Sequence, residues 1–430
     1  MIKVKNIRGF RKFLFNIRVK LRVFFYFVGK LSTGKISFRN FFRVLGRLLY
    51  FLSTIQHNKF VKIGKFIRVG LYIPGFPSRP FFTACDKFAH FKGKLPDTTV
   101  LISLTSACGF NCRHCYQKLD KGKDIEIEKL IDTVKKIQNN GVAFINIEGG
   151  EPFLVYDRLK KVCEVIDNRS EIWINSNGDG MTPERLKELK SLGLTAVMFS
   201  YHLLNKEELN KFMGSDKAYD SIQTGIKLCH EAGIAVALNI CLQRSDFYNG
   251  RFEEIMERAK NINAAIIQLI KPKAAGAWLE SGVEEFSGDD IKQVVKLVNK
   301  FNLDKNYREY PSISAQIMEE APEMFGCTSG GTDRFYINAK GDLQPCEFLN
   351  ISFGNIATDD FDVIYEKMRS YFNGPGECML CEKYAGEILK IYKENNLTTL
   401  PLTPELSKKI YEHWDRGKKT KLYEVIEKGN

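Results

Sequence analysis

The organisation of this chain is decided by the stretch Cys108-Gly109-Phe110-Asn111-Cys112-Arg113-His114-Cys115-Tyr116. Its three cysteines recur after four and then three residues, so that one tight loop can turn all three thiolates inward. Three thiolates suit a [4Fe–4S] cluster that keeps one iron open, whereas a closed cluster or a structural zinc site takes four ligands. Zinc remains an alternative at this point, with His114 or a distant cysteine as the fourth ligand.

Two apolar segments place this loop at the edge of a sheet. Residues 98–104 read as a buried strand that ends just before the cysteines. Residues 143–147 read as a second apolar strand, which runs into Glu148-Gly149-Gly150-Glu151-Pro152. Because glycine lets a backbone come close to a ligand, we expect a ligand at this turn, with the carboxylate of Glu151 receiving a cation.

Together the two motifs resemble those of the radical S-adenosylmethionine (radical SAM) enzymes, where CxxxCxxC follows the first barrel strand and GGEP the second. In that family the amino acid end of S-adenosylmethionine (SAM) chelates the open iron, and the GGE(P) stretch binds its amino group. The resemblance covers residues 97–390 and disfavours zinc at the first cysteine group.

Strands and helices alternate from residue 98 onward. We expect further strands at 171–175, 196–200, 235–240 and 266–270, and helices at 125–140, 157–167, 183–192, 217–232, 251–260 and 288–301. Asp124 is the expected N-cap of the first helix, and Gly141 follows its end. Six strands with crossover helices form a parallel sheet whose ligand loops share one edge. The expected class is α/β, and the resemblance implies a partial (β/α)6 TIM-like barrel.

The resemblance also implies where SAM and the reacting groups lie. The positions expected to bind SAM are Phe110, His114, Gly149, Gly150, Glu151, Pro152, Asn175, Asn177, Ser200 and Asn239. Gln268 and Lys271 point to the same edge and are expected to meet SAM or substrate. His202 and Cys241 also lie at strand ends, and they are our candidates for catalytic transfer of a proton or hydrogen atom. Ordinary capping of a strand end is the alternative for each single position.

A second cysteine group follows the expected barrel and consists of Cys327, Cys346, Cys378 and Cys381. Residues 336–338 and 343–346 predict a hairpin around Gly341. Four thiolates can close one tetrahedral site, for zinc as well as for iron–sulfur. Behind a radical SAM barrel this pattern resembles the twitch module, the shortened relative of the SPASM extension. The resemblance implies one auxiliary [4Fe–4S] cluster, since the cysteines for the second cluster of a full SPASM module are not present.

The positive charge of the chain is concentrated at its start. Residues 1–85 contain 18 Lys and Arg and no Asp or Glu, so the rest of the chain is net negative although the total is +13. Residues 8–28 and 36–52 repeat apolar side chains at helical spacing. These apolar stripes are Phe10, Phe13, Leu14, Ile17, Leu21, Phe24, Phe25 and Val28, then Phe38, Phe41, Phe42, Leu45, Leu48, Leu49 and Leu52.

Basic residues lie off both stripes, and Arg39, Arg43 and Arg47 form a ridge along the second helix. Amphipathic helices with bulky apolar residues and a basic face are typical of segments that lie in a membrane interface. The alternatives are that both stripes pack on the catalytic domain, or that the segment binds nucleic acid, of which helical stripes are not typical. We therefore expect an anionic membrane surface as a partner and nucleic acid not to be one.

The expected plan has five parts: a basic amphipathic helical extension (1–58), a hairpin and connector (59–96), the radical SAM barrel (97–305), the twitch/SPASM-like module (306–390) and C-terminal helices (391–430). Eleven cysteines favour metal chemistry over disulfides. We recognise no signal peptide and no membrane span. We place the protein in the cytoplasm, at the cytoplasmic face of the membrane.

The expected activity is reductive cleavage of SAM to a 5′-deoxyadenosyl radical, which abstracts hydrogen from a membrane-associated or lipid-linked substrate. The auxiliary cluster favours an oxidative outcome, and the resemblance implies a reductase, flavodoxin or ferredoxin as electron donor. One alternative is a peptide-modifying maturase whose first 96 residues bind the peptide. The other is a non-catalytic membrane-bound iron–sulfur electron carrier, which leaves GGEP unexplained.

Overall fold

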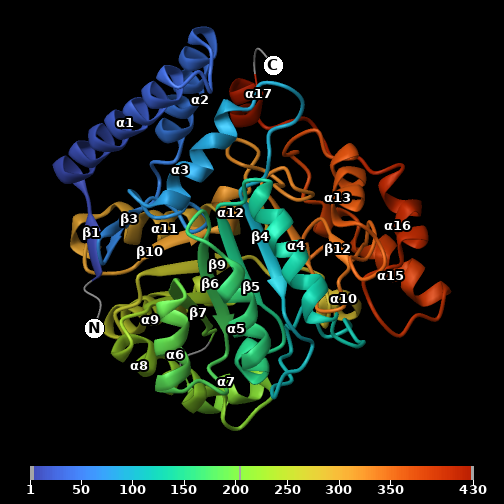
Figure 1. Ribbon diagram of the computed structural model, residues 1–430. Coiled ribbons are helices and arrows are strands. Elements are labelled where there is room, and N and C mark those ends of the chain that lie inside the picture. Colours follow the sequence, from blue (N-terminus) through green and yellow to red (C-terminus); the bar gives the residue numbers. More distant parts are fainter. Residues whose placement is uncertain (1–3, 203–204, 428–430) are drawn as a thin grey trace.

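The computed structural model describes residues 4–202 and 205–427, and its centre is a nine-stranded sheet (Figure 1). The strand order is β10-β9-β8-β7-β6-β5-β4-β11-β12, and every neighbouring pair except β11 and β12 is parallel. The bounds are β4 (Thr99–Ser103), β5 (Phe144–Glu148), β6 (Glu171–Ser176), β7 (Leu194–Ser200), β8 (Ala235–Cys241), β9 (Ile266–Ile270), β10 (Ser312–Ala315), β11 (Arg334–Ile337) and β12 (Leu343–Gln344). The six predicted strands are β4 to β9, in chain order, which confirms the parallel α/β fold.

Helices cover the outer face of this sheet. The predicted ones are α4 (Ile127–Asn139), α5 (Tyr156–Val165), α6 (Pro183–Ser191), α8 (Ala218–Glu231), α9 (Arg251–Asn261) and α11 (Gly288–Leu303). The short helices α7 (Lys206–Met213) and α10 (Trp278–Ser281), which lie between predicted elements of the barrel, were not predicted. The predicted cap of α4 is wrong, because the carboxylate of Asp124 accepts hydrogen bonds from Thr105 Oγ1 at 2.6 Å and Ser106 N at 3.0 Å instead.

The barrel sheet extends beyond the six predicted strands on both sides. β10 pairs with β9, and the predicted hairpin is present as β11 and β12, but β11 also pairs with β4. β10 was missed because Ser312-Ile313-Ser314-Ala315 lacks an apolar run. Since β10 lies in the sheet, the expected module boundary at residue 305 falls inside the barrel. The remaining helices of this half are α12 (Gln316–Glu319), α13 (Phe361–Ser370), α14 (Leu380–Lys383), α15 (Ala385–Glu394), α16 (Pro404–Tyr411) and α17 (Lys421–Glu427).

The N-terminal residues form a module of their own at one end of the barrel (Figure 1). It contains β1 (Val4–Ile7), α1 (Gly9–Ser32), α2 (Phe38–Thr54), β2 (Phe60–Ile63), β3 (Phe66–Arg68) and α3 (Arg79–Asp86). The three strands form an antiparallel sheet, and the predicted hairpin turns at Gly64, whose φ is +57°. The module's core includes side chains of α17, so the last helix of the described chain packs on α2.

The apolar stripe predicted on α1 faces outward. Phe10 is 72% exposed and Phe25 is 64% exposed, whereas Phe27 on the opposite side is fully buried. The large exposed apolar side chains of both helices are Phe10, Phe13, Leu14, Ile17, Leu21, Phe24, Phe25, Phe38, Phe42, Leu49 and Tyr50. The apolar stripe predicted on α2 is only partly exposed, because Phe41 and Leu48 are buried. α1 is therefore apolar on two sides.

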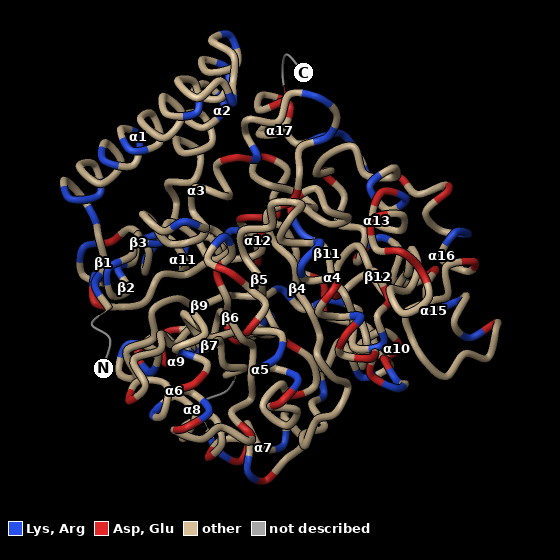
Figure 2. The backbone as a smooth tube through the Cα atoms, in the orientation of Figure 1, with Lys and Arg blue, Asp and Glu red and all other residues tan. Residues whose placement is uncertain are grey.

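The predicted arginine ridge on α2 is not a continuous solvated face. Arg47 is buried, and its guanidinium donates to the carbonyl oxygens of Phe88 at 3.1 Å and His90 at 2.8 Å. Arg43 and Arg47 both stack on the ring of Phe91. Figure 2 shows Lys and Arg but no Asp or Glu along α1 and α2. Among the residues that the structure describes, none of the helices has the length and apolar character needed to cross a bilayer.

The N-terminal module closes one end of the barrel interior. Val61 of β2 and Leu71 of the following loop pack with Phe144, Trp173 and Met198 inside the barrel. Beside them, the buried guanidinium of Arg68 forms an ion pair with Glu171. The large cavity inside the barrel lies at the opposite end, where the parallel strands have their carboxyl termini.

Candidate active site

A cavity of about 440 Å³ lies at the carboxyl ends of the parallel strands, around the cysteine loop. We call it the cysteine-loop cavity. Cys108, Cys112 and Cys115 all line it, as do His202 and Cys241. Of the expected SAM-binding positions, those in its wall are Phe110, His114, Gly149, Gly150, Asn175, Asn177, Ser200 and Asn239. Residues distant in the sequence thus meet at one site.

The two glycines bring the loop after β5 against the cysteine loop. A Cβ atom on Gly150 would overlap the carbonyl group of Ala107, and one on Gly149 would lie 2.7 Å from the oxygen of Thr105. Gly149 also has φ +148°, which favours glycine. Gly150 N donates a hydrogen bond to Thr105 O at 2.7 Å. Glycine is therefore required here because two backbone segments approach each other closely.

Of the two carboxylates in the stretch Glu148–Pro152, Glu148 is the one that lines the cavity. Glu151 is fully buried outside the cavity wall, and its side chain accepts hydrogen bonds from Phe153 N, Ser176 Oγ and Asn177 N. Pro152 also lies outside the wall, where it begins a 3-10 helix at Pro152–Val155. Strand alternation could have identified Glu148, because residues 144, 146 and 148 of β5 share the inward face.

Several buried polar atoms around the cavity have no hydrogen-bond partner in the described part of the chain. They are Asn175 Oδ1, Asn239 Oδ1, His114 Nδ1 and His202 Nε2. A buried polar atom without a partner is costly, so such atoms mark places where a polar ligand binds. Together with the three thiols, this donor set fits SAM on an iron–sulfur cluster.

The ring of His202 has a defined protonation state. Its Nδ1 accepts a hydrogen bond from Cys241 N at 3.0 Å, so Nε2 carries the proton in the neutral ring. Burial lowers the pKa of His202 well below its ordinary value, and the neighbouring His114 adds to the effect. The side chain is therefore placed to donate a hydrogen bond rather than to accept a proton.

The thiol of Cys241 is also buried, and burial raises its pKa to about 12. It stays protonated at neutral pH, so it can give a hydrogen atom but cannot act as a base. Gln268 lines the cavity as expected. Lys271 does not, because its ammonium group forms an ion pair with Glu382 at 2.9 Å.

The second cysteine group lies next to the cysteine-loop cavity. Cys327, Cys346 and Cys381 line one small cavity, whereas Cys378 lies outside its wall, with its sulfur 3.8 Å from Lys383 Nζ. No three His, Cys, Asp or Glu side chains of the described residues are grouped closely enough to hold a single metal ion. The sulfur of Cys346 donates to Glu347 at 3.0 Å.

Lys273 separates the two cavities and lines both. It was not singled out from the sequence, because nothing local marks a lysine after a strand as buried. Its ammonium group pairs with Glu382 at 2.6 Å and Glu320 at 3.3 Å, and these carboxylates raise its pKa despite burial. The wall between the cysteine groups is therefore charged but internally neutralised.

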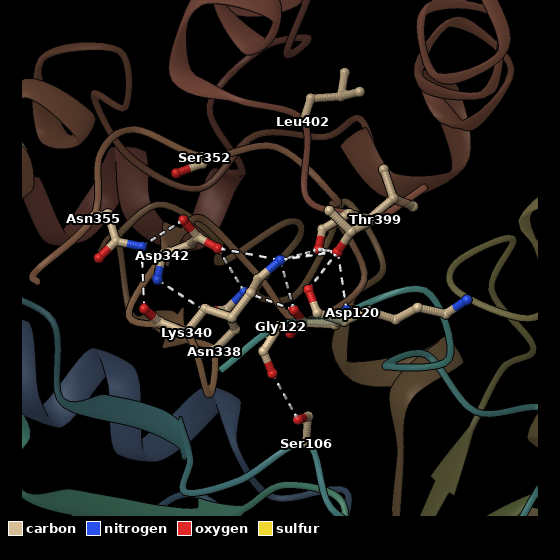
Figure 3. Close-up of polar contacts among 12 residues, drawn as sticks. Ser106, Asp120, Gly122, Asn338, Lys340, Asp342, Ser352, Asn355, Thr399 and Leu402 are labelled. Atoms are coloured by element: carbon tan, nitrogen blue, oxygen red, sulfur yellow. Dashed lines mark hydrogen bonds and ion pairs between the residues drawn. The ribbon is translucent and has the colours of Figure 1, made fainter. Parts of the chain in front are cut away.

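The loop after Cys115 is held to the C-terminal half of the chain (Figure 3). Lys340 Nζ lies 3.0 Å from the carboxylate of Asp120 and donates to Thr399 Oγ1 at 3.1 Å and Leu400 O at 2.7 Å. Asn338 donates to the same carboxylate at 3.2 Å. These contacts fix the cysteine loop relative to the hairpin that carries Cys346.

A parallel partial barrel with a three-cysteine loop and a glycine-rich loop at its carboxyl edge defines a class, the enzymes that bind SAM on an iron–sulfur cluster. Two family models match this chain. The model described as the Radical SAM superfamily matches residues 102–259, and the SPASM model, described as an iron–sulfur cluster-binding domain, matches residues 327–383.

Similar proteins agree with these matches. An AdoMet-dependent heme synthase of Nitratidesulfovibrio vulgaris is 24% identical over 311 residues, which cover 65% of this chain and 83% of that protein. A probable GTP 3′,8-cyclase of Saccharolobus islandicus is 25% identical over 256 residues, 57% of this chain and 81% of that protein. The crystal structure of Streptococcus suis SuiB bound to S-adenosylmethionine aligns with a TM-score of 0.54 at 15% identity, over 67% of this chain and 71% of that chain.

The chain is a radical SAM enzyme of the radical SAM superfamily, with a SPASM-type module. Its cofactors are SAM, the [4Fe–4S] cluster that binds it, and auxiliary iron–sulfur. The hypothesis of a non-catalytic electron carrier is thereby set aside.

Proposed function

We propose that this enzyme oxidises a C–H bond of an apolar substrate that it collects at an anionic membrane surface. The observation that supports the proposal is the exposed apolar stripe of α1 and α2, which lies in a segment without a single acidic residue. Scattered exposed apolar residues are ordinary, whereas contiguous apolar surface marks an interaction site. Arg11, Arg18 and Arg22 are exposed along one flank of the stripe on α1.

The energies favour interfacial binding. Each large apolar side chain that is fully inserted contributes about 1.5–3 kcal/mol. Each Lys or Arg near anionic lipid adds roughly 1 kcal/mol, which salt weakens. Insertion of part of the stripe therefore suffices for reversible binding, and the inner face of α1 stays packed on the module.

The chain's own residues have distinct tasks at the site. Cys108, Cys112 and Cys115 would hold the SAM-binding cluster, and the four later cysteines one auxiliary cluster. When bound, the reduced cluster and SAM supply a 5′-deoxyadenosyl radical that removes a substrate hydrogen atom, and an auxiliary cluster can take up the electron left behind. His202 Nε2 would donate a hydrogen bond to bound SAM or substrate. A reductase, flavodoxin or ferredoxin would supply the electron for SAM cleavage.

Vesicle sedimentation tests the membrane part of the proposal. We expect the full-length enzyme to pellet with anionic phosphatidylglycerol vesicles, and Phe10→Ser with Phe25→Ser and Phe42→Ser to reduce partitioning at least tenfold. Phe41 is left intact because it is buried, with its ring 5.7 Å from that of Phe24. The matched control changes Leu303 and Val363, exposed apolar residues elsewhere, to Ser.

Equal pelleting with and without vesicles would refute the membrane-surface proposal. The alternative is a peptide-modifying maturase, and the SuiB structure bound to precursor peptide SuiA shares this fold at a TM-score of 0.53. That likeness concerns the fold alone. A peptide substrate bound by residues 1–96 in the absence of vesicles would favour the alternative.

A further inference from the structure

A second cavity, of about 130 Å³, lies between helix α2 and the barrel. Its wall includes Ser314 of β10 and Arg334 of β11, the strands that extend the sheet on its two sides. We call it the lateral cavity. Its apolar lining comes from α2, the loop after β3 and two further segments, and includes Leu48, Phe51, Leu52, Ile55, Val69 and Phe325.

Two side chains separate the lateral cavity from the cysteine-loop cavity. Tyr72 and Gln268 line both, and Gln268 Nε2 donates a hydrogen bond to the hydroxyl group of Tyr72 at 2.8 Å. The ring of Tyr72 packs edge-to-face on Phe144, at 5.7 Å between centroids. The two cavities therefore meet at these two side chains.

At its other end the lateral cavity approaches the exposed stripe. Leu49 is 44% exposed, and Leu52, one helical turn later, is half-buried and lines the cavity. Phe51 and Phe325 are also half-buried at this end, with ring centroids 6.0 Å apart. Apolar side chains of α2 thus extend from its outer face into the wall of the cavity, which Tyr72 also lines.

The charged groups of the wall already have partners. Arg334 pairs with Glu320 at 3.0 Å, and Lys87 pairs with Asp333 at 2.6 Å. Glu319 accepts hydrogen bonds from Asn58 and Ser314, whereas Thr99 Oγ1 and His57 Nδ1 have no partner among the described residues. The remaining lining is mainly apolar and suits the apolar part of a ligand. The volume resembles that of an engineered apolar cavity of about 150 Å³ that stays dry and binds benzene.

We propose that the lateral cavity binds the apolar end of the substrate, an alkyl or prenyl chain, while the rest of the substrate reaches past Tyr72 into the cysteine-loop cavity. This inference rests on the proposed function, because it assigns a route to the substrate collected at the membrane. It makes the N-terminal module part of substrate binding as well as of membrane attachment.

Photo-cross-linking tests the site directly. The cluster-loaded full-length enzyme, without vesicles or SAM, is irradiated with dodecanol that carries a terminal diazirine. We expect cross-links in residues 48–55 and 69–74, competed by excess plain dodecanol. Ala84→Phe, on α3 in the cavity wall, should lower their yield at least tenfold. Thr83→Phe, the neighbouring residue outside the wall, should leave it unchanged.

Cross-links confined to the outer face of α1, or insensitive to dodecanol, would overturn the inference. Competition by plain dodecanol is measured on the wild-type enzyme. It therefore tests the lateral cavity even if Ala84→Phe fails to fold. Vesicle sedimentation separates the two proposals: normal membrane binding without cavity labelling refutes only the lateral site. Cavity labelling without membrane binding refutes only the membrane-surface proposal.

Discussion

The two ends of the barrel are built from opposite chemistry. The carboxyl end holds the cysteine loop, with buried polar atoms such as Asn239 Oδ1 and His202 Nε2 that have no partner within the described residues. The amino end is filled by apolar side chains of the N-terminal module, and its buried charges, Arg68 and Glu171, are paired. The carboxyl end leaves several buried polar atoms for cofactors to satisfy, whereas the buried charges Arg68 and Glu171 at the amino end are paired within the chain. Substitutions should therefore impair activity at the first end and stability at the second.

The largest expected effect is at the carboxyl end. Changing Cys108, Cys112 and Cys115 together to Ala should reduce 5′-deoxyadenosine formation to background, because no site for the SAM-binding cluster remains. Iron should fall from about eight to about four per chain, since each [4Fe–4S] cluster holds four. Chromatography of the nucleoside and iron analysis measure both. Cys163→Ala, in the core of α5, is the control, and SAM cleavage surviving the triple change would contradict the assignment.

Removal of the second cysteine group should give the complementary iron count. Changing Cys327, Cys346, Cys378 and Cys381 to Ala should also leave about four irons per chain, but substrate-free SAM cleavage should continue. The physical reason is that the two cysteine groups line separate cavities. Metal analysis of the wild type decides the kind of site: about four irons with one tightly bound zinc would mean that the second group is a structural zinc site.

At the amino end we expect a loss of stability instead. Arg68→Met leaves the buried carboxylate of Glu171 without its ion-pair partner, and such a change costs about 3–5 kcal/mol of unfolding free energy. Denaturant titration of the cluster-loaded protein measures it. The double variant with Glu171→Gln should be less impaired than the single one. Lys123→Ala, in an exposed ion pair, should change stability by less than about 1 kcal/mol.

The pH dependence of the unfolding free energy should also distinguish the carboxyl end of the barrel from the amino end. Burial, with Glu347 nearby, raises the pKa of Glu148 from its ordinary 4.5 to about 8. The folded state therefore holds this proton more tightly than the unfolded state, so its contribution is complete below pH 4.5 and is lost as pH rises to about 8. In SAM-free protein, Glu148→Gln should flatten the decline in unfolding free energy over this range. An unchanged slope would show that Glu148 does not titrate there.

The smallest effect expected per residue concerns the surface beyond the amino end. Replacing Arg11, Arg18 and Arg22 by Gln should weaken vesicle binding by roughly 1 kcal/mol each at low salt and by less at high salt. Fold and SAM cleavage should remain unchanged, because these side chains are exposed. Binding that loses its salt dependence without weakening at low salt would contradict this account of the arginines.

Local patterns in the sequence were sufficient to predict the parallel sheet, and the resemblance to radical SAM enzymes implied the barrel. Runs such as residues 98–104 are apolar on both faces, which predicts a buried parallel strand, and the cysteine loop follows directly. The resemblance then implied that Asn175, Asn177 and Asn239, at or near strand ends, lie around the cavity, where the structure places them. In each case the signal lies within a few consecutive residues.

What could not be predicted depends on distant contacts. Periodicity showed that α1 is amphipathic, but Phe15, Val19 and Phe27 also lie at helical spacing, and only the packing of α2 and α3 decides which face is buried. Similarly, nothing near Arg47 in the sequence reveals the carbonyl groups of Phe88 and His90 that bind it. Tyr72 enters the barrel because the preceding strands form a sheet with β1, from the other end of the module.

The packing of α17 on α2 has a consequence for the order of synthesis. Leu422, Tyr423 and Ile426 complete the core of the N-terminal module, yet the ribosome makes residues 9–54 long before residues 421–427. The nascent helices α1 and α2 therefore emerge with their inner apolar face uncovered as well as their outer one. If the proposed membrane binding holds, a chain still being translated offers a lipid surface more apolar area than the finished enzyme does, and attachment would be favoured from the first helices onward, before the barrel is complete.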